Sequence, residues 1–107
     1  MVEIRSVGVI GAGQMGSGIA HVCALGGYDV LLHDVSAERI DAGLTHIEQA
    51  MARQVSRGLI DQAAMDAGLA RIKGAPELQA VGASDLAIEA ATENEEVKKT
   101  IFRALSP

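Results

Sequence analysis

The chain has 107 residues and a formal net charge of −5. Its length predicts a single domain, and its charge argues against a nucleic-acid partner because no basic stripe is present to neutralise phosphates. A single cysteine, Cys23, excludes an internal disulfide framework and a multi-cysteine zinc site. No stretch approaches the roughly 18–20 apolar residues that span a bilayer, and no signal peptide is visible, so we expect no membrane association and a cytoplasmic protein.

The histidines and the cysteine give no sign of a metal site or a nucleophile. His21, His33 and His46 lack the spacing of metal ligands, and we expect each on a helix face or at the surface. Cys23 falls in the middle of a predicted helix, where a buried structural thiol is the ordinary case. We therefore expect no metal ion.

The N-terminal third alternates strand, helix and strand. Residues 2–10 include several β-branched residues and end at a glycine, which predicts a buried strand. Residues 14–25 combine small and larger apolar residues and are followed by two glycines, which predicts a helix. The short apolar run at residues 28–33 predicts a second strand, and Asp34 follows it.

Two helices are predicted next. Ser36 is a good N-cap for the first, along which apolar residues recur at spacings of four and three on one face. Gly58 is predicted to end this helix and Asp61 to begin another, which gives a helical hairpin over about residues 37–69. The pair is longer than a plain crossover requires, so we expect it to project from the sheet.

The remaining residues continue the alternation. They predict a short strand at 71–73, a clear strand at 85–91 and a last helix that begins at Asn94. This order predicts an α/β fold, with a Rossmann-like parallel sheet, flanking helices and the projecting hairpin. A sheet that ends at strand 85–91 exposes an apolar edge, so we expect a homodimer or a larger assembly.

Residues 11–16 read Gly-Ala-Gly-Gln-Met-Gly, and the strand before them and the helix after them make this pattern a strong indication of a dinucleotide site. Gly11 allows a tight turn, Gly13 lets a pyrophosphate approach the backbone, and Gly16 lets the helix pack on the strand. The N–H groups and the dipole of the helix N-terminus attract the anion. The predicted cofactor contacts are all six residues of the loop: Gly11, Ala12, Gly13, Gln14, Met15 and Gly16.

Asp34 stands at the end of the second strand, close to the place of the acid that binds the adenosine ribose, about 20 residues beyond the loop. A carboxylate there accepts hydrogen bonds from ribose hydroxyls and repels a 2′-phosphate. Residues 35–38 contain no Arg or Lys, and Arg39 lies a helical turn away, so we expect NAD rather than NADP. Two alternatives stay open, an FAD-binding unit and a glycine-rich turn of an unrelated α/β protein.

A second candidate segment follows strand 85–91. If that strand runs parallel to the first, Ala91 and Glu93 come beside the cofactor at the carboxyl edge of the sheet. Glu93 and Lys98 span the junction between loop and helix, where a salt bridge or contacts to the nicotinamide ribose are plausible. Spacing alone favours the simpler interpretation, in which Glu93 caps the helix and Lys98 is solvated.

The loop sequence GAGQMGSGIA at 11–20, Asp34, the helical pair and DLAIEAATENEEVKK at 85–99 together resemble the L-3-hydroxyacyl-CoA dehydrogenases. The bacterial stand-alone type, which acts on 3-hydroxybutyryl-CoA, is the most similar. The resemblance implies an NAD-binding domain, here residues 1–107, truncated before the last strands and the helical C-terminal domain of the complete enzyme. Such enzymes oxidise L-3-hydroxyacyl-CoA to 3-ketoacyl-CoA with NAD in fatty-acid and butanoate metabolism.

The resemblance also implies roles for single residues. It assigns Glu93 and Lys98 to the nicotinamide side, against the simpler interpretation of their spacing. It places coenzyme A contacts on the hairpin, where a serine and a lysine of the family correspond to Ala50 and Arg57. Arg57 keeps a positive charge for a phosphate of the acyl-CoA substrate, whereas Ala50 has no hydroxyl to donate.

The family's catalytic histidine stands in a His-Phe-Phe-Asn-Pro segment, which these 107 residues do not contain. We therefore expect the general base downstream of Pro107 and no turnover by this chain alone. Two other functions stay open: the NAD-binding domain of another hydroxy-acid dehydrogenase, and a nucleotide-binding module without chemistry.

Overall fold

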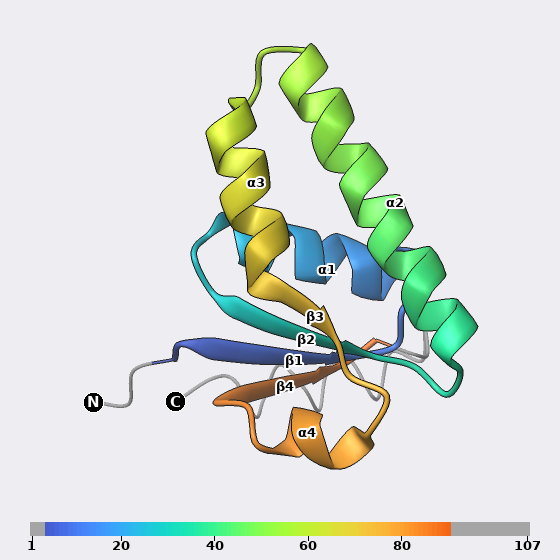
Figure 1. Ribbon diagram of the computed structural model, residues 1–107. Helices are drawn as coiled ribbons and strands as arrows, with labels where there is room; N and C mark the ends of the chain where they lie inside the picture. The colour runs from blue at the N-terminus through green and yellow to red at the C-terminus, as the bar shows by residue number, and fades with distance from the viewer. Residues whose placement is uncertain (1–3, 91–107) are drawn as a thin grey trace.

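The computed structural model describes residues 4–90 as a four-stranded parallel sheet with helices on both faces (Figure 1). The strand order is β3-β2-β1-β4, and each neighbouring pair is parallel, as the sequence predicts. The elements in chain order are β1 (Ser6–Ile10), α1 (Gln14–Leu25), β2 (Asp29–His33), α2 (Ala37–Ser56), α3 (Gln62–Arg71), β3 (Ile72–Gly74), α4 (Leu78–Gly82) and β4 (Leu86–Glu89).

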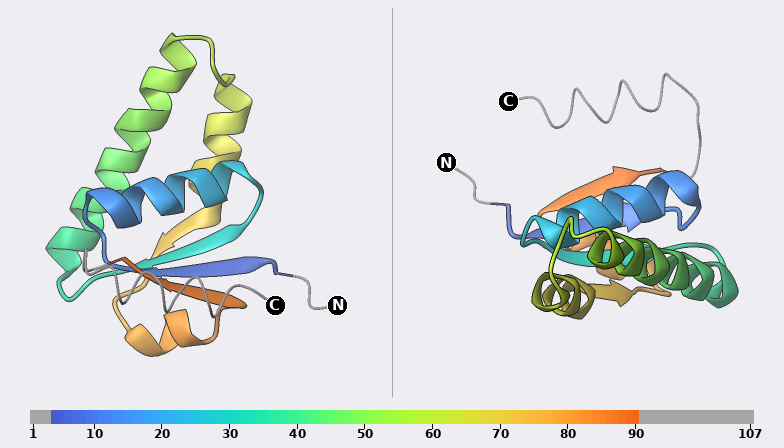
Figure 2. Two further views of the ribbon diagram at one scale, coloured as in Figure 1. Left: turned by 180° about the vertical axis from the view of Figure 1, so that it is seen from behind. Right: turned by 90° about the horizontal axis from the view of Figure 1, so that it is seen from above.

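The sheet separates two layers of helix. Helices α1, α2 and α3 lie on one face of the sheet and α4 lies on the other, as Figures 1 and 2 both show. Alternate side chains of the strands point toward α1 and form the core with it. Among residues 4–90, the buried hydrophobic cluster consists of Val, Ile, Leu, Met and Ala side chains: Val7, Val9, Ala12, Ala20, Ala24, Val30, Leu32, Ile47, Met51, Met65, Ile72 and Ala90.

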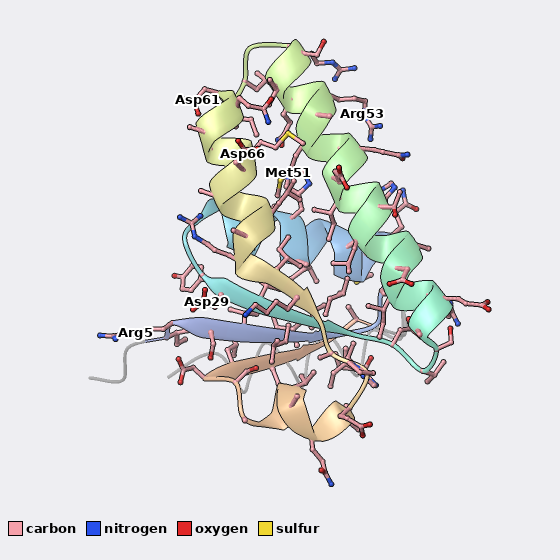
Figure 3. The ribbon with its side chains drawn as sticks, in the orientation of Figure 1. Arg5, Asp29, Met51, Arg53, Asp61 and Asp66 are labelled. Atoms are coloured by element: carbon pink, nitrogen blue, oxygen red, sulfur yellow. The ribbon has the colours of Figure 1, made fainter. Side chains whose placement is uncertain are left out.

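The predicted hairpin consists of α2 and α3, and it projects from the sheet (Figure 1). Met51 lies between the two helices with no exposed surface, whereas Arg53 points away from them (Figure 3). The side chain of Ser36 caps α2 and that of Asp61 caps α3, both as predicted. Although α2 has 20 residues, no helix within residues 4–90 is long and apolar enough to cross a membrane.

Gly58 ends α2 as predicted, and its geometry explains why a glycine stands there. Its φ is +72°, and its N–H donates to the carbonyl of Val55 while the N–H of Leu59 donates to that of Gln54. This pair of hydrogen bonds is the Schellman arrangement, which satisfies the last carbonyls of a helix and requires a left-handed residue.

The first two strands begin later than the sequence predicts. β1 begins at Ser6 rather than residue 2, and the carboxylate of Asp85 accepts hydrogen bonds from the N–H groups of Arg5 and Ser6 at 2.8 and 3.1 Å. β2 begins at Asp29 rather than residue 28, because the N–H of Tyr28 donates to the carbonyl of Cys23 and closes α1.

The later elements differ in small ways. β3 covers Ile72–Gly74 rather than 71–73, because Arg71 still belongs to α3 and its guanidinium donates to the carbonyl of Ala24 at 2.8 Å. β4 covers Leu86–Glu89 within the predicted 85–91. The helix predicted from Asn94 lies outside the described residues.

Helix α4 was not expected from the sequence. Its Val81 is fully buried against the sheet, and a Cβ on Gly8 of β1 would collide with the Val81 side chain. The missing side chain of Gly8 therefore leaves room for α4 to pack on β1. A contact between residues so far apart in the sequence has no local sequence signal.

Two glycine substitutions should have opposite effects on stability. Gly58→Ala should lower the free energy of unfolding by about 1–2 kcal/mol, because its left-handed φ strains a residue with a Cβ. Gly18→Ala should raise it by about 0.5–1 kcal/mol, because Gly18 is inside α1 and a Cβ there meets nothing within 4 Å. Urea unfolding followed by circular dichroism measures both, and a Gly58→Ala variant as stable as the wild type would contradict the left-handed end of α2.

Candidate cofactor-binding site

The glycine loop joins β1 to α1 at the carboxyl end of the sheet. Gly11 has a φ of +112°, and its N–H donates to the carbonyl of His33 at the end of β2 at 2.7 Å. A Cβ on Gly16 would collide with the carbonyl of Gly11, so the helix packs directly on the turn. A Cβ on Gly13 would meet nothing within 4 Å. The first and third glycines are therefore required by the fold, while the second borders open space.

The N-terminus of α1 differs from those of α2 and α3. Gly13 is its N-cap residue, and no side chain accepts a hydrogen bond from its first turn. The first four N–H groups of any helix lack acceptors within the helix. The N-termini of α2 and α3 each have a capping side chain, whereas that of α1 faces the open space at Gly13. Such an N-terminus is a ready site for a phosphate group.

Asp34 follows β2 and points back to the glycine loop. Its Oδ2 accepts a hydrogen bond from the N–H of Ala12 at 2.8 Å, and its Oδ1 accepts one from the N–H of Val35 at 2.6 Å. Its side chain is 9% exposed. Burial raises the pKa of this carboxyl, but the two backbone hydrogen bonds and the charge of Arg39 outweigh it and hold the pKa below its ordinary value. Asp34 is therefore an ionised hydrogen-bond acceptor beside the loop.

Two residues that support the loop were missed in the sequence. Ser17 is 1% exposed, and its hydroxyl donates to the carbonyl of Ala12 at 3.1 Å. Gly43 of α2 faces the same carbonyl, because a Cβ there would lie 2.9 Å from it. A glycine on the apolar face of a helix costs stability relative to alanine, so its position beside Ile40 and Ile47 was a signal of close packing.

Arg57, the predicted contact to coenzyme A, does not lie at the loop. Arg57 is the C-cap of α2, at the tip of the hairpin. Because α2 has 20 residues, this tip lies about 30 Å along the helix axis from the N-cap. The remaining three, Ala91, Glu93 and Lys98, lie outside the described residues, so their roles stay predictions.

The histidines differ in their surroundings. His33 was expected on a helix face or at the surface, and this is wrong: it is 9% exposed within β2, and its Nδ1 lies 2.8 Å from the carbonyl oxygen of Ala75. The side chain of His21 on α1 contacts that of Gln54 on α2, with Nε2 and Oε1 2.7 Å apart.

Cys23 shows no sign of a nucleophile, because burial raises the pKa of its thiol and so disfavours the thiolate. Within residues 4–90, no group of three or more candidate ligands could hold a metal ion.

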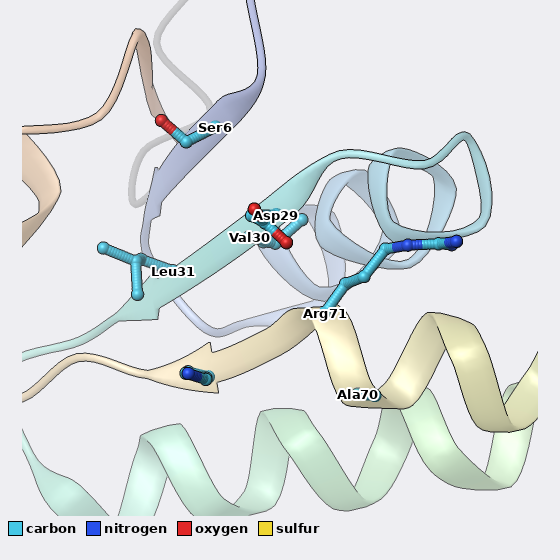
Figure 4. A pocket seen from close by; sticks show the side chains of 7 residues that line it. Ser6, Asp29, Val30, Leu31, Ala70 and Arg71 are labelled. Carbon is cyan, nitrogen blue, oxygen red and sulfur yellow. The ribbon is translucent and has the colours of Figure 1, made fainter.

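A pocket of about 310 Å³ lies at the amino ends of the strands, at the end of the sheet opposite the glycine loop (Figure 4). It is lined by residues at the amino ends of β1 and β2, such as Ser6 and Asp29, and by the junction of α3 with β3, including Arg71. Ligands of open α/β sheets bind at the carboxyl ends of the strands. The pocket is therefore separate from the glycine loop.

The glycine loop at the end of β1, the uncapped helix and the acid after β2 define a dinucleotide-binding domain of the Rossmann type. The family model for the "3-hydroxyacyl-CoA dehydrogenase, NAD binding domain" matches residues 6–107. The chain therefore belongs to this family, and its cofactor is NAD. The residues fit that cofactor, since the open space at Gly13 leaves room for the pyrophosphate.

Several relatives and solved structures are similar over nearly the whole chain. The 3-hydroxybutyryl-CoA dehydrogenase of Bradyrhizobium diazoefficiens is 52% identical over 95% of this chain and 35% of its own length. The 3-hydroxyadipyl-CoA dehydrogenase of Escherichia coli is 40% identical over 99% of this chain and 22% of its own length. The crystal structure of (S)-3-hydroxybutyryl-CoA dehydrogenase from Ralstonia eutropha matches with a TM-score of 0.82 and 37% identity, over 96% of this chain and 36% of that one. The chain thus spans about a third or less of these proteins.

Two loop glycines should separate binding from folding. Gly13→Ala should lower the free energy of unfolding by only about 1 kcal/mol, because alanine is a poorer N-cap but its Cβ points into open space, yet weaken NAD binding at least about tenfold by filling the place of the pyrophosphate. Gly16→Ala should cost more than about 3 kcal/mol, because its Cβ collides with the Gly11 carbonyl. Calorimetric titration and urea unfolding measure the two effects. Undiminished NAD affinity in Gly13→Ala would place the cofactor elsewhere.

The lowered pKa of Asp34 predicts an acid-dependent loss of stability. A carboxyl whose pKa is lower in the folded state stabilises the fold fully above its ordinary value of about 3.9, and this contribution disappears as the pH falls through the lowered value. The stability gap between wild type and Asp34→Asn should therefore narrow from about pH 5 to about pH 3. Urea unfolding across this range measures the gap, with Asp41→Asn, an exposed carboxylate of α2, as the control. A gap independent of pH would contradict the assignment.

Proposed function

We propose that this chain is the cofactor-binding part of an enzyme that oxidises L-3-hydroxyacyl-CoA, and 3-hydroxybutyryl-CoA in particular, to the 3-ketoacyl thioester with NAD. The observation that carries the proposal is the pairing of an uncapped α1 N-terminus at Gly13 with the Asp34 carboxylate, which is tied to the same loop. The relatives support the reaction class, since two of them are named for dehydrogenation of 3-hydroxyacyl-CoA compounds.

The proposed roles follow the geometry of the described residues. The N–H groups of the first turn of α1, from Gly13 to Gly16, bind the pyrophosphate, and the helix dipole of α1 favours its negative charge. The N–H groups of Gly11 and Ala12 position the loop instead, because they already donate to the His33 carbonyl and to Asp34. Asp34 accepts hydrogen bonds from the adenosine ribose, because each carboxylate oxygen keeps a lone pair beyond its backbone contact. We therefore propose that the adenosine end of NAD lies over the carboxyl end of β2.

The nicotinamide end and the substrate complete the proposal. We assign Ala91, Glu93 and Lys98 to the nicotinamide side, since they follow β4, which pairs with β1 next to the loop. In the reaction, C3 of the substrate gives a hydride to NAD, and its hydroxyl gives a proton to a base. The 107 residues contain no His-Phe-Phe-Asn-Pro segment to supply that base. Arg57 at the hairpin tip is proposed to pair with a phosphate of coenzyme A.

The acyl group and the assembly are further parts of this proposal. A butyryl substrate is favoured because the relative with 52% identity is named for it, while the relative named for the adipyl compound has 40% identity. A homodimer or a larger assembly is proposed because β4, among residues 4–90, pairs with β1 alone. A strand at the edge of a sheet is a template for pairing with another chain.

A titration with NAD and a test for turnover check the proposal together. The protein should bind NAD, Asp34→Ala should weaken that binding at least about tenfold, and Asp61→Ala, which removes a cap far from the loop, should not. With 3-hydroxybutyryl-CoA and NAD present, the 107-residue chain alone should form no NADH, because it lacks the base. Equal NAD affinity of wild type and Asp34→Ala, or NADH formation, would overturn the proposed roles.

A further inference from the structure

Arg39 lies closer to Asp34 than its position in the sequence suggests. It stands in the first turn of α2, where its backbone N–H donates to the Ser36 hydroxyl at 3.2 Å. Its side chain turns back toward β2, so that its Nε lies 3.7 Å from Oδ1 of Asp34. The expectation that Arg39 is a helical turn away from the ribose site is therefore wrong for its side chain.

The two charged groups differ in exposure. The side chain of Asp34 is 9% exposed and is fixed by two backbone hydrogen bonds, whereas that of Arg39 is 65% exposed. Because the Arg39 side chain is largely exposed, solvent screens its attraction to Asp34, and the ion pair contributes little to stability. The guanidinium is therefore free to exchange one anionic partner for another at small cost to the fold.

The pair combines the two groups that separate NAD from NADP sites. An acid at this position binds the ribose 2′-hydroxyl in NAD enzymes, and a nearby arginine accommodates the 2′-phosphate in NADP enzymes. A guanidinium suits a phosphate because it presents a planar fork of donors. Here the carboxylate repels a 2′-phosphate at the same place where the arginine would attract it.

We propose that Arg39 is a latent 2′-phosphate-binding residue, which Asp34 holds in an ion pair and shields from NADP. Removal of the Asp34 charge alone then converts the site from NAD toward NADP, without any added positive charge. This inference rests on the proposed function, because it takes the adenosine ribose to lie at Asp34. It goes beyond that function by assigning Arg39 on α2 a part in the choice between NAD and NADP.

A set of four proteins tests this inference by calorimetric titration with NAD and NADP: wild type, Asp34→Ser, Asp34→Ser with Arg39→Gln, and Asp34→Ser with Arg53→Gln. Asp34→Ser should raise the affinity for NADP relative to NAD at least about tenfold. Adding Arg39→Gln should remove most of that gain. Adding Arg53→Gln should retain it, because Arg53 is an exposed arginine in the last turn of the same helix and points away from the hairpin (Figure 3).

Fragments of the cofactor isolate the phosphate itself. In Asp34→Ser, adenosine 2′,5′-bisphosphate should bind more tightly than 5′-AMP, and salt should weaken the difference because it screens the guanidinium. Thermal unfolding checks each variant, and Asp34→Asn, whose amide oxygen still accepts from the Ala12 N–H, carries the same expectation if Asp34→Ser does not fold.

The outcomes separate the two proposals. If the variants bind NAD but the NADP gain is absent or does not depend on Arg39, the latent site is wrong and the proposed function stands. If wild type binds neither NAD nor 5′-AMP, the proposed function and this inference fall together.

Discussion

The peptide groups of Ala12 connect the glycine loop to three other elements. The N–H of Ala12 donates to Asp34 after β2, and its carbonyl accepts from Ser17 of α1 and faces Gly43 of α2. Backbone polar groups in a protected loop require such partners. These contacts bring the acid to the loop although 22 positions separate it from Ala12. Together with the pairing of β1 and β2, they fix the position of the carboxylate relative to the loop.

The first N–H groups of a helix need acceptors from outside the helix, and this chain supplies them in two ways. Ser36 and Asp61 satisfy the free N–H groups of α2 and α3, and these caps stabilise the hairpin. At α1 the capping position holds Gly13, which has no side chain to offer. The N–H groups there remain available to an anion, and the proposed function assigns them to the pyrophosphate of NAD.

Two residues of opposite charge, Asp34 and Arg39, lie close together at the carboxyl ends of the strands. Asp34 is ionised at neutral pH and favours a ribose hydroxyl, while Arg39 beside it favours a phosphate. In our proposal, the preference for NAD over NADP is a balance between the Asp34 carboxylate, which backbone hydrogen bonds fix, and the exposed Arg39 guanidinium. Another carboxylate, Asp85, serves the fold at the amino edge, where it binds the backbone at the start of β1. Asp85 thus stabilises the fold at the amino ends of the strands, whereas Asp34 lies beside the glycine loop at their carboxyl ends.

The sequence by itself determined the elements whose signals are local. The glycine spacing indicates the loop and helix α1, Ser36 and Asp61 mark helix starts, and the alternation of strand and helix implies a parallel sheet. Only the tertiary structure decided what depends on distant partners. Asp85 lies opposite the start of β1, Gly8 admits α4, and the Ala75 carbonyl receives a buried His33. The reach of the Arg39 side chain was decided in the same way, since the angle at which α2 leaves β2 sets it, and no residue spacing encodes that angle.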